Sequence, residues 1–370
     1  MKYYLVAGEA SGDLHGANLI KALKEKDADA QLRYFGGDLM QAQGGTLVQH
    51  YSTMAYMGFV QVLMNLRTIL RNMRNCKEDI LAHRPDVLIL IDFPGFNLKI
   101  AEFAKTQGIL VCFYISPKVW AWNQKRVFKI KKVVDHLFCI LPFEVDFYKQ
   151  FGMKVDYVGN PLLDAIATFK PDPDFVQKHR LTDKPIVALL PGSRKQEISR
   201  ILPEMVKLAA QFPHQHFVVA GAPSFELAYY QRFMNGANLP VLFNATYNLL
   251  HYARAAVVTS GTATLETALF DVPQVVVYKA DPILVTAGRK FLKIKYLSLV
   301  NLIMDKLVVK ELIQEECNTQ TLTYELNQLL PDGSYRQRIL DDHAALRHIM
   351  GQPGASAKTA SLIIGYAIKK

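Results

Sequence analysis

Two glycine-containing segments constrain the fold of this 370-residue chain more than any other feature of its sequence. They are residues 8–13 (GEASGD) and residues 190–194 (LPGSR), about half the chain apart. Each follows a short aliphatic run, at 3–7 or 186–190, and precedes a helix-like stretch. Open α/β sheets bind their ligands at the carboxyl ends of strands, where such turns lie. The pattern therefore predicts two similar α/β domains, each with a ligand-binding loop after its first strand.

Strand-like and helix-like segments alternate through both halves of the sequence. Several strand-like segments are continuous aliphatic runs, which is typical of strands buried on both faces of a parallel sheet. The expected strands are residues 3–7, 31–35, 46–50, 87–92, 110–115, 136–140, 154–158, 186–190, 216–220, 241–244, 256–259 and 274–278, and the pattern after residue 278 is mainly helical. We predict an α/β fold in which two Rossmann-like domains, each with a doubly wound parallel sheet, face a central cleft.

Chain length and one change in composition indicate where the domains divide. A chain of 370 residues is long for a single core. Prolines and charged residues replace apolar ones at residues 169–174 (FKPDPD), as they do in linkers. We therefore predict an N-terminal domain over residues 1–168 and a C-terminal domain over residues 169–349.

Composition narrows the classes of protein and of partner. No apolar run approaches the roughly 20 residues needed to span a bilayer. The four cysteines show no C-x-x-C spacing, which indicates a reduced, cytosolic chain without a zinc site or a disulfide framework. The D-x-D patterns at 27–29 and 172–174 lie in polar, loop-like surroundings, so we expect no catalytic metal. A formal net charge of +10 favours anionic partners, namely nucleic acid, a membrane surface or phosphorylated substrates.

The turn at residues 191–194 (PGSR) is a candidate phosphate site. Backbone N–H groups around Ser193 can bind an anion, and Arg194 can bind a phosphate bidentately. The alternative is an ordinary strand–helix turn with a surface arginine.

A second segment, residues 259–266 (TSGTATLE), strengthens the case for a nucleotide in this half of the chain. Ser260, Gly261 and Thr262 open a helix, whose positive end suits a pyrophosphate. Glu266 lies one turn further on, where a carboxylate can accept both hydroxyls of a ribose. The alternative is a plain N-cap with Glu266 completing a capping box. Both interpretations can hold together, since caps and phosphate sites use the same amides.

Acidic residues follow two expected strands of the first half. Asp92 ends the buried run at 87–91, and apolar neighbours there would raise its pKa and make it a better general base. Glu9, Ser11 and Asp13 lie on the predicted loop after the first strand, close to where Asp92 is expected. That loop does not match G-x-G-x-x-G, and its two acids would repel a pyrophosphate, so it suits an acceptor better. The alternative for Asp92 is a helix cap or an ordered turn.

Both tryptophans of the chain lie in one segment, followed by a basic run. Trp120 and Trp122 precede the cations Lys125, Arg126, Lys129, Lys131 and Lys132. Aromatic and basic residues together suit stacking on nucleic acid. They suit contact with a phosphorylated lipid or an anionic bilayer equally well. The remaining alternative is a solvated helix face above core tryptophans.

Residues 54–73 form a basic stretch that is rich in methionine and contains no acid. Its candidate membrane-contact residues are Met57, Leu63, Met64, Arg67 and Arg71. Such an amphipathic segment suits docking on a membrane surface or an acyl-chain groove. Core packing is the alternative use of the same apolar stripe.

Taken together, these segments resemble lipid-A-disaccharide synthases, which are bacterial inverting glycosyltransferases of the GT-B fold. The resemblance runs from Tyr3 to about Cys317. It rests on GEASGD (8–13), SPKVWAWNQKRVFKI (116–130), LPFE (141–144), LLPGSR (189–194), SGTATLE (260–266) and SLVNLI…VKELIQEEC (298–317).

The resemblance implies a reaction and its partners. UDP-2,3-diacylglucosamine would donate its sugar to 2,3-diacylglucosamine 1-phosphate (lipid X), giving the β-1′,6-linked disaccharide and UDP, without a cofactor. The C-terminal domain would hold UDP through Arg194, Ser260, Gly261, Thr262 and Glu266, and Asn301 matches a family position near the donor. The N-terminal domain would hold the acceptor, with Ser11, Asn97, Trp120, Trp122, Lys125 and Arg126 as contacts. A helix near residues 350–370 is expected to return to this domain.

The resemblance also implies a location, and the chain departs from the family pattern at one position. We expect a cytoplasmic protein held peripherally at the inner membrane of a bacterium, with no nucleic-acid partner. Family members often have I-D-x-P-D-F-N, whereas this chain has Gly95 at the second acid. Asp92 is therefore the leading candidate base, ahead of Glu9 and Asp13. The alternatives are another UDP-sugar enzyme, such as a UDP-N-acetylglucosamine 2-epimerase or a muramyl-lipid transferase, and a non-catalytic nucleic-acid-binding protein.

Overall fold

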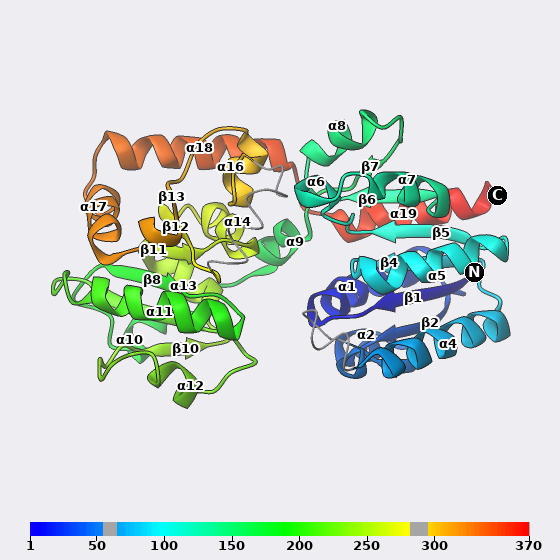
Figure 1. Cartoon of the computed structure of the whole chain (residues 1–370), viewed down its shortest axis with the longest axis horizontal. Coiled ribbons are helices and arrows are strands. Elements are labelled where there is room, and N and C mark those ends of the chain that lie inside the picture. Colours follow the sequence, from blue (N-terminus) through cyan, green and yellow to red (C-terminus); the bar gives the residue numbers. More distant parts are fainter. Residues whose placement is uncertain (55–64, 282–294, 370) are drawn as a thin grey trace. The chain divides into compact units, whose positions relative to one another are not determined.

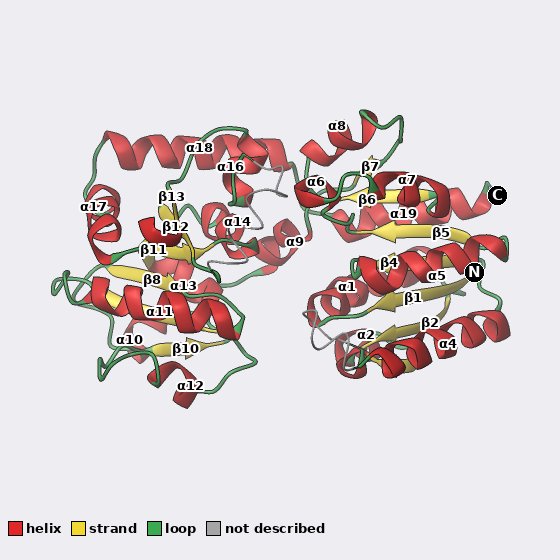
Figure 2. Cartoon of the chain, viewed as in Figure 1, coloured by secondary structure: helices red, strands yellow, loops and turns green. Residues whose placement is uncertain are grey.

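The computed structural model describes residues 1–54, 65–281 and 295–369. The chain divides into two compact units (Figures 1 and 2). One comprises Met1–Asp164 with Gln352–Lys370, and the other comprises Ala165–Gly351. Each unit is a parallel sheet with helices on both faces, which confirms the predicted fold class.

The sheet of the first unit has seven parallel strands in the order β3-β2-β1-β4-β5-β6-β7. Their bounds are β1 (Lys2–Ala7), β2 (Gln31–Gly36), β3 (Thr46–His50), β4 (Val87–Ile91), β5 (Leu110–Tyr114), β6 (His136–Cys139) and β7 (Asp156–Tyr157). The helices are α1 (Ala10–Lys26), α2 (Asp38–Ala42), α4 (Leu66–His83), α5 (Pro94–Thr106), α6 (Val119–Trp122), α7 (Arg126–Val133), α8 (Phe143–Lys149) and α19 (Ala355–Ile368), with a 3-10 turn, η1 (Tyr51–Thr53). Helix α9 (Pro161–Thr168) spans the boundary between the units.

The central strands of this sheet are apolar throughout because both faces are covered. Leu5 and Ile89 belong to the core under α1 and α19. Val6 and Leu90 point the other way, into the core under α4, α5 and α7. Alternate residues of a strand face opposite sides of the sheet, so two cores require an uninterrupted apolar run. The returning helix α19 contacts α1 on its face of the sheet.

The second unit has six parallel strands in the order β10-β9-β8-β11-β12-β13. Their bounds are β8 (Ile186–Leu190), β9 (His216–Gly221), β10 (Val241–Phe243), β11 (Ala253–Thr259), β12 (Gln274–Tyr278) and β13 (Glu311–Ile313). The helices are α10 (Phe175–Lys178), α11 (Lys195–Ala209), α12 (Leu227–Gln231), α13 (Thr246–Tyr252), α14 (Thr262–Leu269), α16 (Leu299–Met304), α17 (Thr319–Leu329) and α18 (Ser334–Met350), with a 3-10 turn, η2 (Gln314–Glu316).

The strand order of each sheet reverses at one point, and the predicted turns lie there. In the first unit the reversal falls between β1 and β4, with Ala7 opposite Ile91. In the second unit it falls between β8 and β11, with Leu190 opposite Val258. Ligands of doubly wound sheets bind at such points, outside the carboxyl ends of the strands. Each unit therefore brings together two of the segments selected from the sequence.

Two sequence-based expectations are corrected here. Helix α1 begins at Ala10, so Ser11 and Asp13 lie in its first turn and not in a loop. Strand β13 was missed, because three residues followed by η2 carry too short a pattern within a stretch expected to be helical. Among the residues that the structure describes, no helix is long and apolar enough to cross a membrane.

Candidate active site

Asp92 lies in a strained turn at the reversal point of the first sheet. Asp92 and Phe93 have φ angles of 44° and 48°, in the left-handed region. The Asp92 N–H donates to the Tyr114 carbonyl at 3.0 Å, and Ile115, after the neighbouring strand, has a φ of 67°. Non-glycine residues in this region cost about 1–3 kcal/mol each, and they concentrate at functional sites. The strain at the ends of β4 and β5 therefore points to function at this edge.

The Asp92 carboxyl has the electrostatic setting expected of a general base. Burial raises its pKa, while the nearby ammonium of Lys118 and a hydrogen bond from the Phe93 amide lower it in part. A carboxylate with a raised pKa accepts a proton more readily near neutral pH.

Asn97 supports this turn from within the core. It is fully buried, and its Nδ2 donates to the carbonyls of Val6 (3.3 Å), Ile91 (3.3 Å) and Asp92 (2.7 Å). Asn97 was predicted to contact the acceptor. The structure instead ties Asn97 to the ends of β1 and β4, so its side chain holds Asp92 in position.

Asp13 is committed to a structural contact. Its carboxylate is buried and accepts from the backbone N–H groups of Gly37 (2.7 Å), Leu39 (3.0 Å) and Met40 (3.1 Å), at the start of α2. These three bonds fix the Asp13 side chain against the start of α2. Glu9 is the half-buried N-cap residue of α1, and Ser11, two residues further on in the first turn of the helix, is exposed. The geometry therefore favours Asp92 over the two acids of the GEASGD segment.

Two glycines border the Asp92 turn in opposite ways. A Cβ added to Gly8 would lie 2.3 Å from the Phe93 ring, so this ring requires a glycine after β1. A Cβ at Gly95 would meet no atom within 4 Å. The position of Gly95 therefore borders open space.

The two tryptophans have different surroundings. Trp120 is buried, meets Phe143 edge-on at 5.0 Å between ring centroids, and donates its indole N–H to Glu144 at 3.2 Å. Trp122 is 52% exposed, and the Arg126 guanidinium lies 5.1 Å from the centroid of its ring. Lys125 beside them is exposed. The structure thus brings Trp122, Lys125 and Arg126 to the surface and places Trp120 in the interior.

The predicted membrane segment is only partly within the described residues. Met57, Leu63 and Met64 lie outside them. Arg67 and Arg71 are exposed on α4, where Leu66 and Leu70 are 46% and 52% exposed.

In the second unit, the turn after β8 already holds a carboxylate. Glu197 Oε2 accepts from the backbone N–H groups of Ser193 (3.0 Å) and Arg194 (3.2 Å), as part of a capping box at the start of α11. This corrects the expectation that these turn amides are free for a phosphate. The Arg194 side chain is 69% exposed, with one 3.4 Å contact to Glu197 Oε1. A phosphate would therefore be bound by the Arg194 guanidinium.

The neighbouring turn after β11 leads into α14. Gly261 is its N-cap residue, and Gly261 and Thr262 are exposed. The Ser260 hydroxyl donates to the Leu297 carbonyl at 2.9 Å. Glu266 accepts a 3.2 Å hydrogen bond from the Tyr247 hydroxyl, and burial raises its pKa. Because Gly261 is the N-cap residue, the capping-box position of α14 is Thr264, and Glu266 does not complete the box that the sequence offered as an alternative.

The Asn301 side chain bonds to the segment between α16 and β13. It is fully buried; its Nδ2 donates to the Val309 carbonyl (2.8 Å) and to Glu311 (2.8 Å). Its Oδ1 accepts from the N–H groups of Val308 (2.9 Å) and Val309 (3.0 Å). A contact between this side chain and the donor would break these bonds, so Asn301 supports the segment between α16 and β13.

Sequence reasoning missed residues that line a hollow of about 330 Å³ at the carboxyl ends of β12 and β13. It is lined by Arg200, Lys279, Ala280, Gln314 and Glu315. Arg200 pairs with Asp281 at 3.1 Å, and Lys279 donates to the Cys317 carbonyl at 3.1 Å. The two cations come from a helix and a strand end that share no motif. Their only sequence signal was the position of Lys279 directly after an expected strand.

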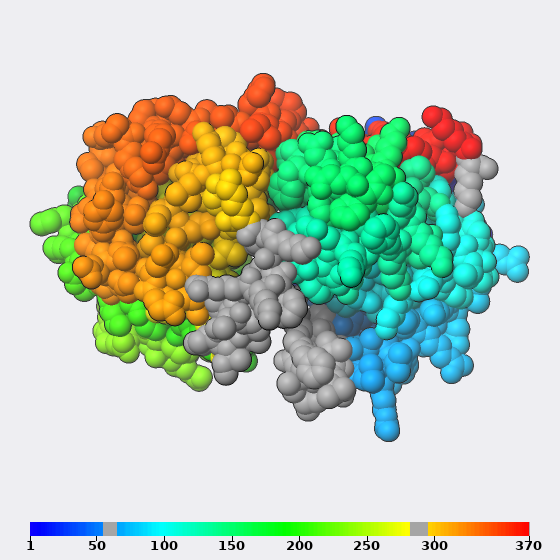
Figure 3. Space-filling view, turned by 45° about the horizontal axis from the view of Figure 1, so that its top comes forward, coloured from blue at the N-terminus to red at the C-terminus, as the bar shows by residue number. Residues whose placement is uncertain are grey.

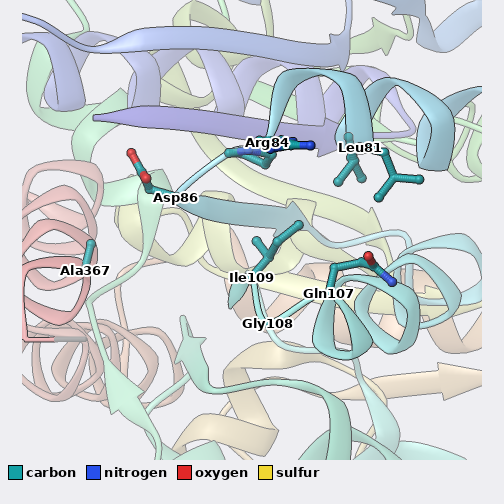
Figure 4. Close-up of a pocket in the computed structure, with 9 residues that line it drawn as sticks. Leu81, Arg84, Asp86, Gln107, Gly108, Ile109 and Ala367 are labelled. Carbon is teal, nitrogen blue, oxygen red and sulfur yellow. The ribbon is translucent and has the colours of Figure 1, made fainter.

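A second hollow, of about 800 Å³, lies at the opposite edge of the first sheet (Figure 4). Arg84, Asp86, Gly108 and Ile109 line it, at the amino ends of β4 and β5. It contains none of the predicted site residues. Among the described residues, no group of three or more His, Cys, Asp or Glu side chains is arranged to hold a metal ion.

Comparisons with known proteins find one family over nearly the whole chain. A family model described as lipid-A-disaccharide synthetase matches residues 3–363. The lipid-A-disaccharide synthase of Trichlorobacter lovleyi is 36% identical over 367 residues, covering 97% of this chain and 96% of that protein. The Myxococcus xanthus synthase is 38% identical over 369 residues, with the same two coverages, 97% and 96%.

Solved structures resemble the fold at low sequence identity. A UDP-GlcNAc 2-epimerase from Neisseria meningitidis aligns with a TM-score of 0.68 and 13% identity over 100% of both chains. The calicheamicin glycosyltransferase aligns with a TM-score of 0.61 and 15% identity, over 99% of this chain and 97% of that one. The two parallel sheets therefore form a GT-B fold.

Proposed function

This chain belongs to the lipid-A-disaccharide synthase family and is a glycosyltransferase of lipid A biosynthesis, and from this premise we propose its substrates and the residues that act on them. The donor is UDP-2,3-diacylglucosamine, and the acceptor is 2,3-diacylglucosamine 1-phosphate. The products are the β-1′,6-linked disaccharide 1-phosphate and UDP.

The observation that carries the proposal is the strained, half-buried Asp92 at the reversal point of the first sheet. In the proposed step its carboxylate takes the proton of the acceptor hydroxyl. The hydroxyl oxygen forms a bond to the anomeric carbon of the donor from the side opposite UDP. The bond between that carbon and the phosphate oxygen breaks, and UDP leaves with the electron pair. A single displacement of this kind inverts the anomeric configuration.

The second unit supplies the proposed UDP site. Arg194 and the N-terminal end of α14, at Gly261 and Thr262, stabilise the charge that develops on the departing pyrophosphate. Glu266 binds the ribose, and Tyr247 orients its carboxylate. Ser260 and Asn301 support the site by fixing the residues just before and after α16.

A direct assay of products tests the proposal. Purified protein is incubated with UDP-2,3-diacylglucosamine and 2,3-diacylglucosamine 1-phosphate in EDTA, and the mixture is analysed by mass spectrometry. We expect a tetraacyl disaccharide 1-phosphate and an equal amount of UDP. Turnover of unacylated UDP-N-acetylglucosamine without disaccharide would contradict the proposal and indicate an epimerase-type activity.

We also propose that the first unit binds the inner face of the cytoplasmic membrane, where both acylated substrates reside. Helices α4, α5 and α7 cover one face of its sheet. The outer side of α4 carries Leu66, Arg67, Leu70 and Arg71, which are exposed. Phe128 on α7 is 62% exposed. Apolar side chains among cations suit an anionic bilayer, at about 1 kcal/mol for each cation near the surface.

Sedimentation with vesicles containing phosphatidylglycerol tests this surface. The double variant Arg67→Ser/Arg71→Ser is expected to bind about 10-fold or more weakly, and high salt should weaken the wild type similarly. The control Leu227→Ser/Arg232→Ser changes an exposed leucine at the start of α12 and the exposed arginine that follows this helix, and it should bind normally. Equal binding of all three proteins would contradict the proposed surface.

A further inference from the structure

Helix α8 holds the tryptophan-containing loop through two side chains one turn apart. Glu144, which is 1% exposed, accepts hydrogen bonds from the Ser116 hydroxyl and from the Trp120 indole at 3.2 Å. Tyr148, also buried, donates to the Pro117 carbonyl at 3.3 Å. Residues four apart on a helix share a face, so α8 contacts this loop at three of its five residues, 116–120.

Glu144 also fixes its own end of the contact. Its Oε2 accepts from the backbone N–H groups of Ile140 (3.2 Å) and Leu141 (3.0 Å). One carboxylate therefore ties the segment after β5 to the segment after β6. With four donors around it, the buried charge is well satisfied. Helices α7 and α8 lie at the surface of the first unit (teal and green in Figure 3).

Lys118 lies between the loop residues that α8 holds. It is the exposed N-cap residue of α6, and its neighbours Pro117 and Val119 are buried. Its ammonium is the charge that lowers the pKa of Asp92 against the effect of burial. The Asp92 N–H donates to Tyr114, which ends the strand leading into this loop. The backbone thus brings Lys118 and Asp92 to the same edge of the sheet.

We propose that Glu144 is a positioning residue that, with Tyr148, holds residues 116–120 so that the Lys118 ammonium stays at the edge of the sheet that carries the Asp92 carboxylate. The proposal rests on the proposed role of Asp92 as the base. Lys118 then sets how readily Asp92 loses and takes a proton. Glu144 acts only through this lysine and does not touch the reacting atoms.

The groups around Glu144 are consistent with this role. The groups that face it and titrate are the Cys139 thiol and the hydroxyls of Tyr148 and Tyr157. Burial raises the pKa of Glu144 to about 6, and its hydrogen bonds oppose the rise. At neutral pH the side chain is therefore ionised and can accept all four bonds. Among the described residues, the Lys118 ammonium is the charge that lowers the pKa of Asp92.

The sign of the expected effect follows from the charge of Lys118. Its positive charge favours the ionised form of Asp92, so removing it raises the pKa of Asp92. Releasing the loop lets the ammonium move into solvent, which has the same effect. A glutamine at 144 has the shape of glutamate, but its amide N–H groups would face the N–H groups of Ile140 and Leu141. Glu144→Gln should therefore displace the loop.

The test measures the pKa of Asp92 directly in the free protein. Protein labelled with ¹³C-aspartate is titrated by NMR, with Asp92→Asn to assign the signal, and the acid limb of kcat/KM is recorded in parallel. Lys118→Met and Glu144→Gln should each raise the pKa of Asp92 by about half a unit or more. The double variant should show no larger shift than Lys118→Met alone. The control Lys149→Met, an exposed lysine on α8, should show none.

Each outcome decides a separate point. A folded Glu144→Gln with an unchanged Asp92 pKa, or additive shifts in the double variant, would overturn the proposal. If Glu144→Gln does not fold, Ser116→Ala and Tyr148→Phe each remove one contact and keep Glu144. A raised Asp92 pKa in either supports the proposal, and unchanged values in both overturn it. Normal turnover of Asp92→Asn would refute the base and leave the NMR test of Lys118 and Glu144 intact.

Discussion

The Asn97 amide donates a 2.7 Å hydrogen bond to the backbone carbonyl of Asp92. Asp92 and the next residue, Phe93, form the strained turn. The same nitrogen lies 3.3 Å from the carbonyls of Val6 and Ile91. One buried side chain thus joins the ends of the two strands between which the sheet order reverses. The position of the proposed base depends on a residue that does not face solvent.

Replacing Asn97 should therefore impair turnover more than substrate binding. In Asn97→Ala the three carbonyls lose their donor, which costs about 1–3 kcal/mol for buried groups, and the Asp92 turn can relax. We expect kcat to fall about 10-fold or more with a smaller change in KM. Asn97→Asp should be worse, because a carboxylate would face three carbonyl oxygens. Steady-state kinetics measure this effect, with Asn238→Ala, at an exposed asparagine, as the control. An unchanged kcat in Asn97→Ala would show that the Asp92 turn keeps its shape without the Asn97 side chain.

Asp92→Asn tests the proposed base itself. The amide has the same shape but cannot take the acceptor's proton, so kcat should fall about 10²–10⁴-fold. The affinity for UDP, measured by calorimetry, should be unchanged, because the UDP site is proposed to lie in the other unit. Asp146→Asn, an exposed aspartate on α8, is the control. Near-normal turnover would move the role to Glu9, since the Asp13 carboxylate is occupied by three backbone donors.

The contact between Gly8 and Phe93 predicts a mutation that can be compensated. In Gly8→Ala the new methyl group would lie 2.3 Å from the ring. The ring must move, which typically costs about 1–3 kcal/mol. We expect a lower Tm and reduced turnover. Adding Phe93→Leu should recover part of the Tm, whereas Gly95→Ala, where a Cβ meets nothing, should leave the Tm nearly unchanged. A Gly8→Ala protein as stable as the wild type would contradict this account of the glycine.

Arg194 should account for much of the affinity for UDP. A charge-assisted hydrogen bond contributes about 1.5–3 kcal/mol, so Arg194→Ala should weaken binding of UDP by about 10- to 150-fold. Arg194→Lys should restore only part of it, because lysine lacks the planar fork of donors. Calorimetric titration with UDP measures both, with the exposed Arg232→Ala as control. Wild-type affinity in Arg194→Ala would move the phosphate contact towards α14 or the hollow lined by Arg200 and Lys279.

The sequence predicted the sheets well because burial on both faces leaves a strong local pattern. Strands β3 and β8 have the predicted bounds, and the apolar run of β8 ends at the Pro191-Gly192 turn. The sequence indicated a loop where the first turn of helix α1 lies. GEASGD contains two glycines and has the composition of a loop, but Gly12 lies against Ala7 within the first turn of the helix.

The functional side chains were located by motif, but their partners were not. Asp13, Asn97 and Asn301 are polar residues at the ends of elements, which is the usual signal of a binding residue. Asp13 and Asn97 instead bond backbone groups far along the chain, at Gly37 and Val6, and Asn301 bonds the nearby Val308 and Val309. Glu197 occupies the turn amides that a phosphate was expected to bind. Such pairings depend on tertiary contacts, and the spacing of residues in the sequence does not encode them.

A buried histidine predicts that the second unit loses stability in acid. His343 on α18 is fully buried, and neither ring nitrogen has a hydrogen-bond partner among the residues described. Burial lowers its pKa to about 4, with the Asp271 and Asp342 carboxylates opposing this and the Arg347 and Arg336 guanidinium groups adding to it. In the unfolded chain this histidine binds a proton as the pH falls below about 6.5, whereas in the folded chain it stays neutral until the pH approaches 4. The folded state is therefore favoured above pH 6.5, and this contribution is lost as the pH falls towards 4.

Urea unfolding at pH 7 and pH 5, followed by circular dichroism, measures this effect. The difference in the free energy of unfolding between the two pH values should be about 2 kcal/mol smaller in His343→Leu than in the wild type. Leucine fills a similar volume without a group that titrates. His348→Leu, on an exposed position of the same helix, should keep the wild-type difference. If His343→Leu retains the full pH dependence, the acid sensitivity arises from other groups, and His343 is not its source.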